Sequence, residues 1–325
     1  MRTHYLSLGN QVEIAERVNQ TLDSHLRPEE VRITPSQSDA IRFPDSKKRT
    51  PDCWLFVNID RKGMAYFSFG NYRTGYSSGR QDLGNFTPLS PEEIAERREA
   101  EEREKAEKEA KKRRLRDEAE SYFNGLPLAD SFLPKDIHPY LFGKGLYRSY
   151  VARWDRNTEN LVVPFYNSKN EFSGYEWISP AGKPKGYNKG ASKQNSFLAL
   201  YDRKFSDREQ ILVTEGFATG LSAFEAMRGR HIVIIAFDCS NYCGAISSAS
   251  IYLSNKWKIT VPLSRFWILA DNDASKAGED GARKARDALG CHYLLTPILG
   301  MDIDDYRQAY GYDATEKFLQ ENINE

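Results

Sequence analysis

Acidic residues follow three apolar segments in the last third of the 325-residue chain. Glu215 closes the segment ILVTE and Asp238 closes HIVIIAFD, while Asp271 and Asp273 lie at the end of FWILADND. If these segments are parallel strands of one sheet, their carboxyl ends meet at one edge and the acids converge there. Clustered carboxylates repel one another, and a divalent cation that prefers oxygen ligands, Mg²⁺ or Mn²⁺, relieves that repulsion. Such a cation can clamp phosphates, so the pattern indicates phosphoryl-transfer chemistry.

An alternation of apolar and helical segments would position these acids. Four short, nearly continuous apolar runs are typical of strands buried on both faces, and they cover residues 211–215, 231–238, 266–273 and 292–298. Helical segments lie between them, at 217–227, 245–256 and 277–289. The alternation predicts an α/β fold over residues 208–310, with a four-stranded, mainly parallel sheet and helices on both faces. One strand-end aspartate commonly caps the next helix, whereas Glu-Gly and DxD together in this frame favour a site.

A basic segment precedes the predicted sheet. Residues 121–200 carry ten basic and six acidic side chains, whereas residues 201–325 carry 14 and 18. Two apolar stretches, Leu161–Tyr166 and Glu171–Ile178, predict a β-hairpin. The loop that follows holds lysines among glycines and prolines, at positions 183, 185, 189 and 193. We interpret this loop as flexible, cationic and close to the acidic sheet.

Residues 91–120 form the clearest internal boundary, because 22 of these 30 residues are charged. Glu104 and Lys108 are spaced four residues apart in the order that stabilises a helix. Apolar side chains are few, so the segment is predicted to be a long, solvated linker helix.

The N-terminal residues predict a small α+β module, with a helix over 10–27 and β-rich sequence over 40–80. The segment Phe67–Tyr76 is both aromatic and basic. Such a surface can stack bases and pair with phosphates, and the same pattern is also typical of a small β core with exposed tyrosines.

Composition bounds the class of protein. Basic and acidic side chains number 46 each, and the zero net charge excludes a uniformly basic DNA-coating protein. No run approaches the 18 apolar residues of a membrane span, and the N-terminus has no apolar signal core, so we expect a cytoplasmic protein without a membrane partner. Four cysteines, at 53, 239, 243 and 291, are too few and too scattered for a disulfide scaffold.

Several motifs together resemble the Toprim family. VTEGFATGLSAFEA (213–226) resembles its glutamate motif, LADNDASKAGEDGARKA (269–285) its DxD motif, and MDIDDY (301–306) its late acidic motif. IIAFDCSN (234–241) is similar to the second strand of Toprim primases from phages and mobile plasmids. Residues 138–146 and 161–187 are similar to the subdomain that precedes Toprim in those primases, and GMAYFSFGNYRTG to their first module.

The resemblance implies roles for individual acids. Glu215 matches the Toprim glutamate, a general acid/base that also helps to hold metal, and Asp271 with Asp273 matches the metal-binding DxD. These three are the expected catalytic residues. Asp302 matches the late ligand, with Asp304 or Asp305 as its partner. The predicted ligands for Mg²⁺ or Mn²⁺ are Glu215, Asp271, Asp273, Asp302 and Asp305.

The resemblance also implies contacts with nucleotide or DNA. Lys183 and Lys185 lie where the family often has basic residues ahead of the Toprim sheet. The predicted nucleotide- or DNA-binding residues are Lys183, Lys185, Asp238, Asn241 and Lys276. Met301 departs from the Lys-Asp pair of many relatives, which removes one positive charge near the phosphates.

Four domains are expected, with boundaries taken from these patterns. They are an N-terminal α+β module at 1–88, a charged linker helix at 89–120, a basic β-rich subdomain at 121–205 and a Toprim domain at 206–325. The first module contains one cysteine, Cys53, so the zinc finger of bacterial replicative primases is absent. No Walker A pattern occurs, so any replicative helicase would be a separate chain.

The leading hypothesis is a DNA primase of a phage or mobile element, a nucleotidyltransferase that makes short primers on single-stranded DNA from nucleoside triphosphates. The second is a Toprim nuclease or nicking enzyme, because the same carboxylates serve both reactions. The third is a non-catalytic replication scaffold, which the intact Glu215, Asp271 and Asp273 disfavour.

Overall fold

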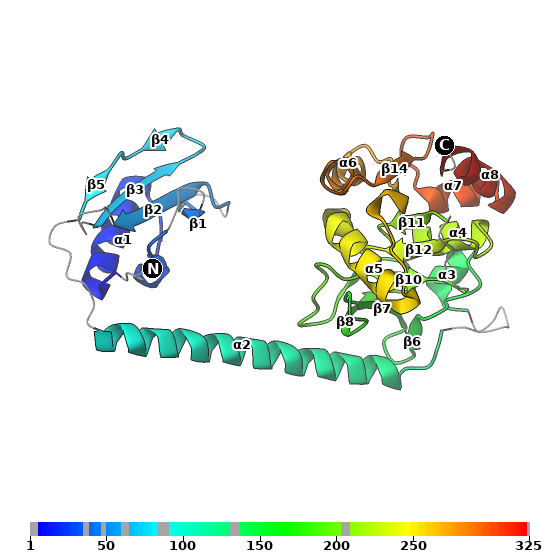
Figure 1. Cartoon of the computed structure of the whole chain (residues 1–325), viewed down its shortest axis with the longest axis horizontal. Helices are drawn as coiled ribbons and strands as arrows, with labels where there is room; N and C mark the ends of the chain where they lie inside the picture. Colours follow the sequence, from blue (N-terminus) through cyan, green and yellow to red (C-terminus); the bar gives the residue numbers. More distant parts are fainter. Residues whose placement is uncertain are drawn as a thin grey trace. The chain divides into compact units, whose positions relative to one another are not determined.

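The computed structural model describes residues 6–34, 39–46, 50–59, 65–83, 91–129, 137–202 and 209–323. The chain divides into two compact units, Met1–Lys108 and Glu109–Glu325, and the division lies within the long helix α2 (Pro91–Gly125; Figure 1). The predicted domain boundaries at 88/89 and 205/206 fall outside the described residues, and the one at 120/121 falls inside α2. Among the residues that the structure describes, no helix is long and apolar enough to cross a membrane.

The first unit combines a helix with an antiparallel sheet. Helix α1 (Leu8–Leu22) begins at Ser7, whose hydroxyl accepts a hydrogen bond from the backbone of Asn10. The helix ends at Leu22 rather than at 27, because Asp23 adopts a left-handed conformation with φ of 49°. A short 3-10 turn, η1 (Pro28–Glu30), follows it.

Five strands make up the sheet of this unit. They are β1 (Ile41–Phe43), β2 (Cys53–Ile59), β3 (Ala65–Asn71), β4 (Tyr76–Ser77) and β5 (Gln81–Asp82). The order is β1-β2-β3-β4, and β5 also pairs with β3. Alternate residues of β2 and β3 are buried with Ile14 and Val18 of α1, which gives this unit its own core.

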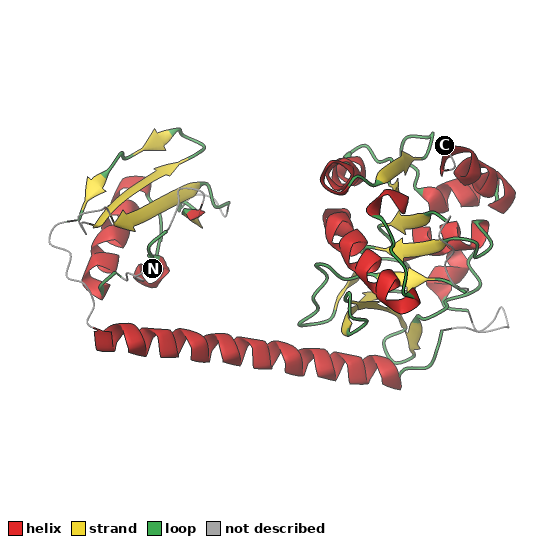
Figure 2. Ribbon diagram, viewed as in Figure 1, coloured by secondary structure: helices red, strands yellow, loops and turns green. Residues whose placement is uncertain are grey.

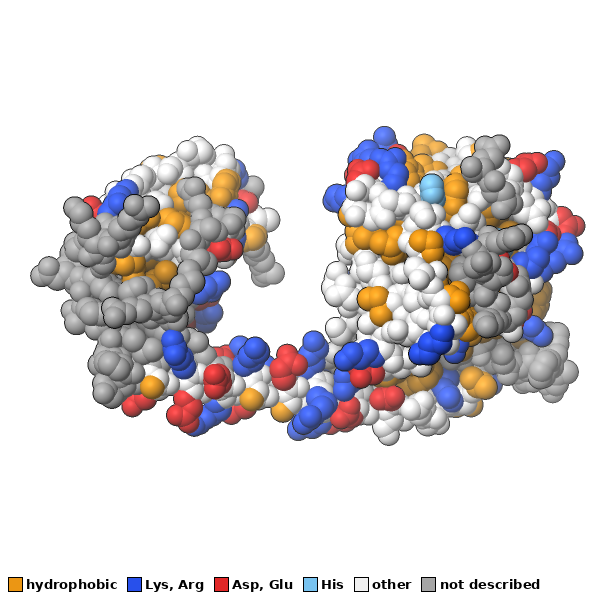
Figure 3. Space-filling model, in the orientation of Figure 1, with side chains coloured by type: hydrophobic (Ala, Val, Ile, Leu, Met, Phe, Trp, Pro, Cys, Tyr) orange, Lys and Arg blue, Asp and Glu red, His pale blue; other side chains and the backbone are white. Residues whose placement is uncertain are grey.

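Helix α2 is charged along most of its length, and Figure 3 shows basic and acidic side chains interleaved on it. Lys108 pairs with Glu104 at 2.5 Å, as the spacing predicts. Near its C-terminal end Phe123 is buried against Phe172. That contact fixes the end of the helix to the second unit.

The second unit begins with an antiparallel sheet in the order β6-β7-β8-β9. Its strands are β6 (Arg153–Asp155), β7 (Asn160–Tyr166), β8 (Phe172–Ile178) and β9 (Lys185–Tyr187), and the short helix α3 (Pro139–Gly143) precedes them. The predicted hairpin is confirmed as β7 and β8. Its turn forms because the side chain of Asn167 accepts hydrogen bonds from the backbone of Lys169 and Glu171, at 2.9 and 3.0 Å.

The second sheet of this unit has the order β10-β12-β11-β13-β14. Its strands are β10 (Leu198–Leu200), β11 (Ile211–Thr214), β12 (Ile232–Ile235), β13 (Phe266–Ala270) and β14 (His292–Leu295). The last four are mutually parallel, which confirms the prediction for residues 208–310. A fifth strand, β10, comes from the preceding segment and runs antiparallel to β12.

Helices cover both faces of this sheet (Figures 1 and 2). One face packs against α5 (Tyr242–Trp257) and α6 (Ala277–Leu289), with the 3-10 turns η4 (Cys239–Asn241) and η5 (Leu263–Arg265) beside them. The other packs against α4 (Phe217–Ala226), α7 (Ile303–Tyr310) and α8 (Tyr312–Ile323). In β11, Ile211 and Val213 point to the first face and Leu212 to the second. Burial on both faces explains why the strands read as continuous apolar runs.

Candidate active site

Glu215 lies at the carboxyl end of β11, the central strand of the parallel sheet, one residue before Gly216 begins α4. The chain crosses from β11 to β12 on one side and reaches β13 on the other, so Glu215 stands where the strand order reverses. Burial, followed by the charge of Asp238, raises the pKa of Glu215, and Lys185 opposes the shift.

Asp271 lies beside Glu215, because it follows β13, the neighbour of β11. Burial raises the pKa of Asp271 to about 7, and the charges of Asp302 and Glu215 add to the shift. Its Oδ1 atom is buried and has no hydrogen-bond partner among the described residues. A buried carboxylate oxygen without a partner is costly, which is the condition that a bound cation would relieve. Helix α6 reaches this backbone closely, since a Cβ atom on Gly278 would stand 2.8 Å from the carbonyl oxygen of Asp271.

Asp302 reaches the same place from the N-terminus of α7. It forms a capping box with Asp305: its Oδ1 accepts a 2.8 Å hydrogen bond from the Asp305 backbone. Its Oδ2 accepts a 2.8 Å hydrogen bond from the hydroxyl of Thr219 in α4. Burial is the main cause of the raised pKa of Asp302.

A buried ionic cluster of Asp304, Arg307 and Lys144 holds α7 in place next to Asp302. The Asp304 side chain is fully buried and lies 2.8 Å from the guanidinium of Arg307 and 2.7 Å from the Nζ atom of Lys144. Ser222 of α4 donates a further 2.7 Å hydrogen bond to the same carboxylate. Although burial opposes it, these donors hold the pKa of Asp304 below its usual value. Asp304 is therefore occupied by protein contacts, whereas the side chain of Asp305 is 45% exposed.

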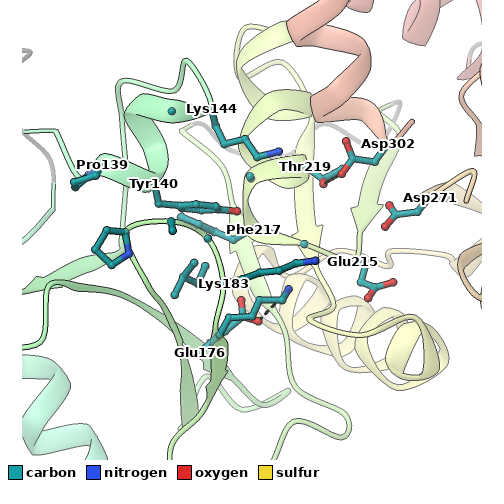
Figure 4. Close-up of a pocket in the computed structure, with 18 residues that line it drawn as sticks. Pro139, Tyr140, Lys144, Glu176, Lys183, Glu215, Phe217, Thr219, Asp271 and Asp302 are labelled. Carbon is teal, nitrogen blue, oxygen red and sulfur yellow. Dashed lines mark hydrogen bonds and ion pairs between the residues drawn. The ribbon is translucent and has the colours of Figure 1, made fainter. Parts of the chain in front are cut away.

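A pocket of about 720 Å³ brings the acids together with lysines, all within the second unit. Glu215, Asp271 and Asp302 line one side, and Lys144 and Lys183 extend toward them from the other (Figure 4). Lys185 also lines the pocket, and its ammonium lies 3.5 Å from Glu176. The arrangement can hold a cation and phosphate groups side by side.

Glu176 is a pocket residue that the sequence analysis missed. It lies in β8, its side chain is 3% exposed, and burial raises its pKa although the charge of Lys185 opposes the shift. The signal was present in the alternation of EFSGYEWI, where Glu176 takes an inward position between Gly174 and Ile178. A charge at an inward position of a strand is costly to bury, and such a residue beside a pocket is a candidate for a functional role.

Two of the predicted metal ligands lie beside the pocket rather than on its wall. Asp273 accepts a 2.7 Å hydrogen bond from Ser275, and its charge acts on both Asp271 and Glu215. Asp305 lies within 4.8 Å of Asp302, and its charge also raises the pKa of Asp271. The five acids thus form one electrostatically coupled group. Carboxylate oxygens alone make up this donor set, which suits Mg²⁺ or Mn²⁺.

None of the remaining predicted residues is among the described residues that line the pocket. Asp238 caps η4 and pairs with Lys193. Asn241 is completely buried and donates to the carbonyls of Lys193, Ser196 and Ala236 at 2.9–3.0 Å. Asn241 therefore fixes the end of the loop that holds lysines 183 to 193 to the residue after β12. A direct contact of Asn241 with nucleotide stays a prediction.

Lys276 is exposed at the start of α6, where it adopts a left-handed conformation with φ of 60°. It does not line the pocket among the described residues. Its contact with nucleotide or DNA likewise stays a prediction.

Residues 210–313 match the family model of the Toprim domain. This part of the chain is a Toprim domain. The match contains β11 to β14 and all five acids of the coupled group. No curated protein matches the chain.

Solved primase structures are similar to part of this chain at low identity. The RNA polymerase domain of Mycobacterium tuberculosis primase DnaG is 17% identical with a TM-score of 0.38, over 58% of this chain and 63% of that one. The DnaG primase catalytic domain bound to ssDNA is 17% identical with a TM-score of 0.38, over 62% and 61%. The E. coli primase catalytic core is 17% identical with a TM-score of 0.38, over 66% and 72%. The chain spans about three-fifths of the length of the first two, and the likeness is limited to part of the fold.

Proposed function

We propose that this chain is a DNA primase, which joins nucleotides into short primers on single-stranded DNA. The observation that carries the proposal is the pocket in which Glu215, Asp271 and Asp302 face lysines. The Toprim match accounts for the acids, and the resemblance of residues 138–146 and 161–187 to the subdomain that precedes Toprim in primases favours this reaction over others at a Toprim site. Phosphodiester formation needs both acids and lysines, because the reacting phosphate group is a polyanion. The acids would hold a cation that neutralises it, and the lysines bind it directly.

The acids divide into two roles in this proposal. Glu215 accepts the proton of the attacking 3′-hydroxyl while the hydroxyl oxygen bonds to the α-phosphorus and pyrophosphate leaves. The raised pKa of Glu215 makes its carboxylate basic enough to hold that proton. Asp271 and Asp302, with Asp273 and Asp305 beside them, would hold Mg²⁺ or Mn²⁺. A cation bound there would supply the positive charge that neutralises the phosphate groups of the substrate.

The lysines bind and orient the substrates. Lys183 faces the acids across the pocket, in reach of a nucleotide phosphate or the template backbone (Figure 4). Lys185 has the same role, and Glu176 fixes its ammonium. Asp238 and Lys276 follow the carboxyl ends of β12 and β13, the edge of the sheet along which the template strand would pass.

The cellular setting of the proposal comes from sequence. The resemblance of residues 234–241 to primases of phages and mobile plasmids favours a role in the replication of such an element. We expect it to act in the cytoplasm with nucleoside triphosphates and a separate replicative helicase.

The products of one reaction test the proposal. Wild-type protein is incubated with Mn²⁺, labelled nucleoside triphosphates and unlabelled single-stranded DNA, and in parallel with labelled DNA. Short labelled oligomers that require all components support a primase. Shortened DNA without synthesis would instead identify a Toprim nuclease or nicking enzyme, and neither product would identify a scaffold.

A further inference from the structure

The sheet of the first unit has one face in the core and one face rich in aromatic side chains. In β2, Cys53, Leu55 and Val57 are buried, and Trp54 and Phe56 alternate with them on the other face. In β3 the same alternation places Tyr66 and Ser68 on that outer face. Among the described residues, these strands present no aliphatic side chain there, so the apolar area consists of ring faces.

The first cluster on this face joins β1, β2 and the residue after β3. Trp54 lies opposite Arg42 on one side and Gly70 on the other. A Cβ atom on Gly70 would stand 2.8 Å from the Trp54 ring, so the missing side chain lets that ring lie across the sheet. Tyr72 is 57% exposed, its ring centre lies 6.2 Å from that of Trp54, and the Arg42 guanidinium lies 4.1 Å above its ring.

The second cluster repeats this arrangement nearby. The rings of Phe56 and Tyr66 have centres 6.2 Å apart, and the guanidinium of Arg80 lies 4.2 Å above Tyr66. Arg80 also pairs with Asp82 at 2.7 Å, which offsets part of its charge. Phe56 is two residues from Trp54 on the same strand, so the clusters are about 7 Å apart along β2.

We propose that this aromatic face, defined as Trp54, Phe56, Tyr66 and Tyr72 with Arg42 and Arg80, binds the unpaired bases of a single-stranded nucleic acid. Tyr72 is exposed, and the rings of Trp54, Phe56 and Tyr66 are half-buried on this face. Ring faces accept any base by stacking, and sheets with aromatic residues on one face are a common surface for unpaired bases. A guanidinium carries five N–H donors, so an arginine stacked on a tyrosine ring can also donate to a phosphate. The site lies outside the Toprim domain and does not rest on the function proposed for it.

Ring removal in the full-length protein tests this inference. Binding of fluorescein-labelled dT15 and rU15 is measured by anisotropy in a Lys183→Ala/Lys185→Ala background, which weakens binding at the pocket. Adding Trp54→Ala with Tyr72→Ala should raise the Kd about tenfold or more, because each stacked ring contributes substantially. The salt dependence should stay the same, whereas Arg42→Gln should lower its slope by about 0.7. Equal losses for dT15 and rU15 mean that bases are bound without regard to the sugar, and a loss for one alone identifies the preferred strand.

Matched variants separate binding from folding. Tyr76→Ala removes an exposed ring that packs on Phe69, on the opposite side of the same sheet, and should leave the Kd unchanged. Trp54→Phe with Tyr72→Phe keeps both rings and should keep most of the affinity. If the double alanine variant does not fold, the exposed Tyr72→Ala alone and the quenching of Trp54 fluorescence by dT15 give the same answer.

Two results would overturn the inference. One is a double alanine variant that folds and binds both oligonucleotides as tightly as its parent. The other is a change in its sedimentation coefficient without a change in oligonucleotide affinity, which would make the aromatic face a contact between two copies of the chain. Primer synthesis is not measured, so neither result bears on the reaction proposed at the Toprim site.

Discussion

The hydroxyl of Thr219 donates a 2.8 Å hydrogen bond to Oδ2 of Asp302. Thr219 lies in the first turn of α4, the helix that follows Glu215, and Asp302 is the residue that begins α7. The bond therefore connects two acids that are far apart in sequence through the starts of their helices. It makes Thr219 a positioning residue for the proposed metal site.

Replacing Thr219 by valine should slow primer synthesis about tenfold, since a hydrogen bond to a charged group is lost while the side-chain volume is kept. The Mn²⁺ concentration for half-maximal synthesis should rise, because Asp302 is less well held. Thr219→Ser restores the hydroxyl and should restore the rate. A valine variant with an unchanged Mn²⁺ dependence would show that Asp302 does not need this bond.

Asp271 should make the metal-free protein sensitive to pH. Its folded pKa of about 7 lies above the ordinary value near 4, so the stability associated with its protonated form is lost as the pH rises through about 7. With EDTA present, the free energy of unfolding of Asp271→Asn should therefore exceed that of wild type by about 1–2 kcal/mol at pH 8. This difference should shrink toward pH 5. Mn²⁺ should stabilise wild type and not the variant. A difference independent of pH would contradict this assignment.

The two pocket lysines should behave differently when removed. Lys183 lines the pocket and forms no ion pair with the residues that the structure describes, so Lys183→Ala should lower the salt slope of single-strand binding by about 0.7 and leave stability unchanged. Lys185→Ala should also lower stability by about 1–3 kcal/mol, because it leaves buried Glu176 without its partner. Adding Glu176→Gln should recover that stability. Equal melting temperatures for both lysine variants would argue against the pairing.

The ionic cluster under α7 should be a large contributor to stability. Arg307→Met removes a partner of fully buried Asp304 and should cost about 3–5 kcal/mol. Arg228→Met is the control, because Arg228 is 67% exposed in its ion pairs and should cost less than about 1 kcal/mol. Chemical denaturation of both variants measures the difference. Similar values for the two would mean that the cluster is not coupled to folding.

The sequence predicted the parallel sheet and the approach of Glu215 to Asp271, because strand-end residues and buried strands follow local rules, whereas the role of Asp302 came from the resemblance to the Toprim family. It did not predict β10, whose three residues pair with β12 only in the folded chain. It left Asp304 and Asp305 unresolved, since the distinction depends on Lys144 and Arg307 approaching Asp304 in space. Glu176 was missed because its partner, Lys185, comes from the neighbouring strand.

The most direct test of the proposed chemistry is primer synthesis by Glu215→Gln. Glutamine keeps the size and hydrogen bonding of the side chain and cannot accept the proton of the attacking hydroxyl. With Mn²⁺, nucleoside triphosphates and single-stranded DNA, we predict that synthesis falls by about 10²–10⁴-fold while thermal unfolding stays normal. Synthesis within tenfold of wild type by a normally folded Glu215→Gln protein would contradict the account.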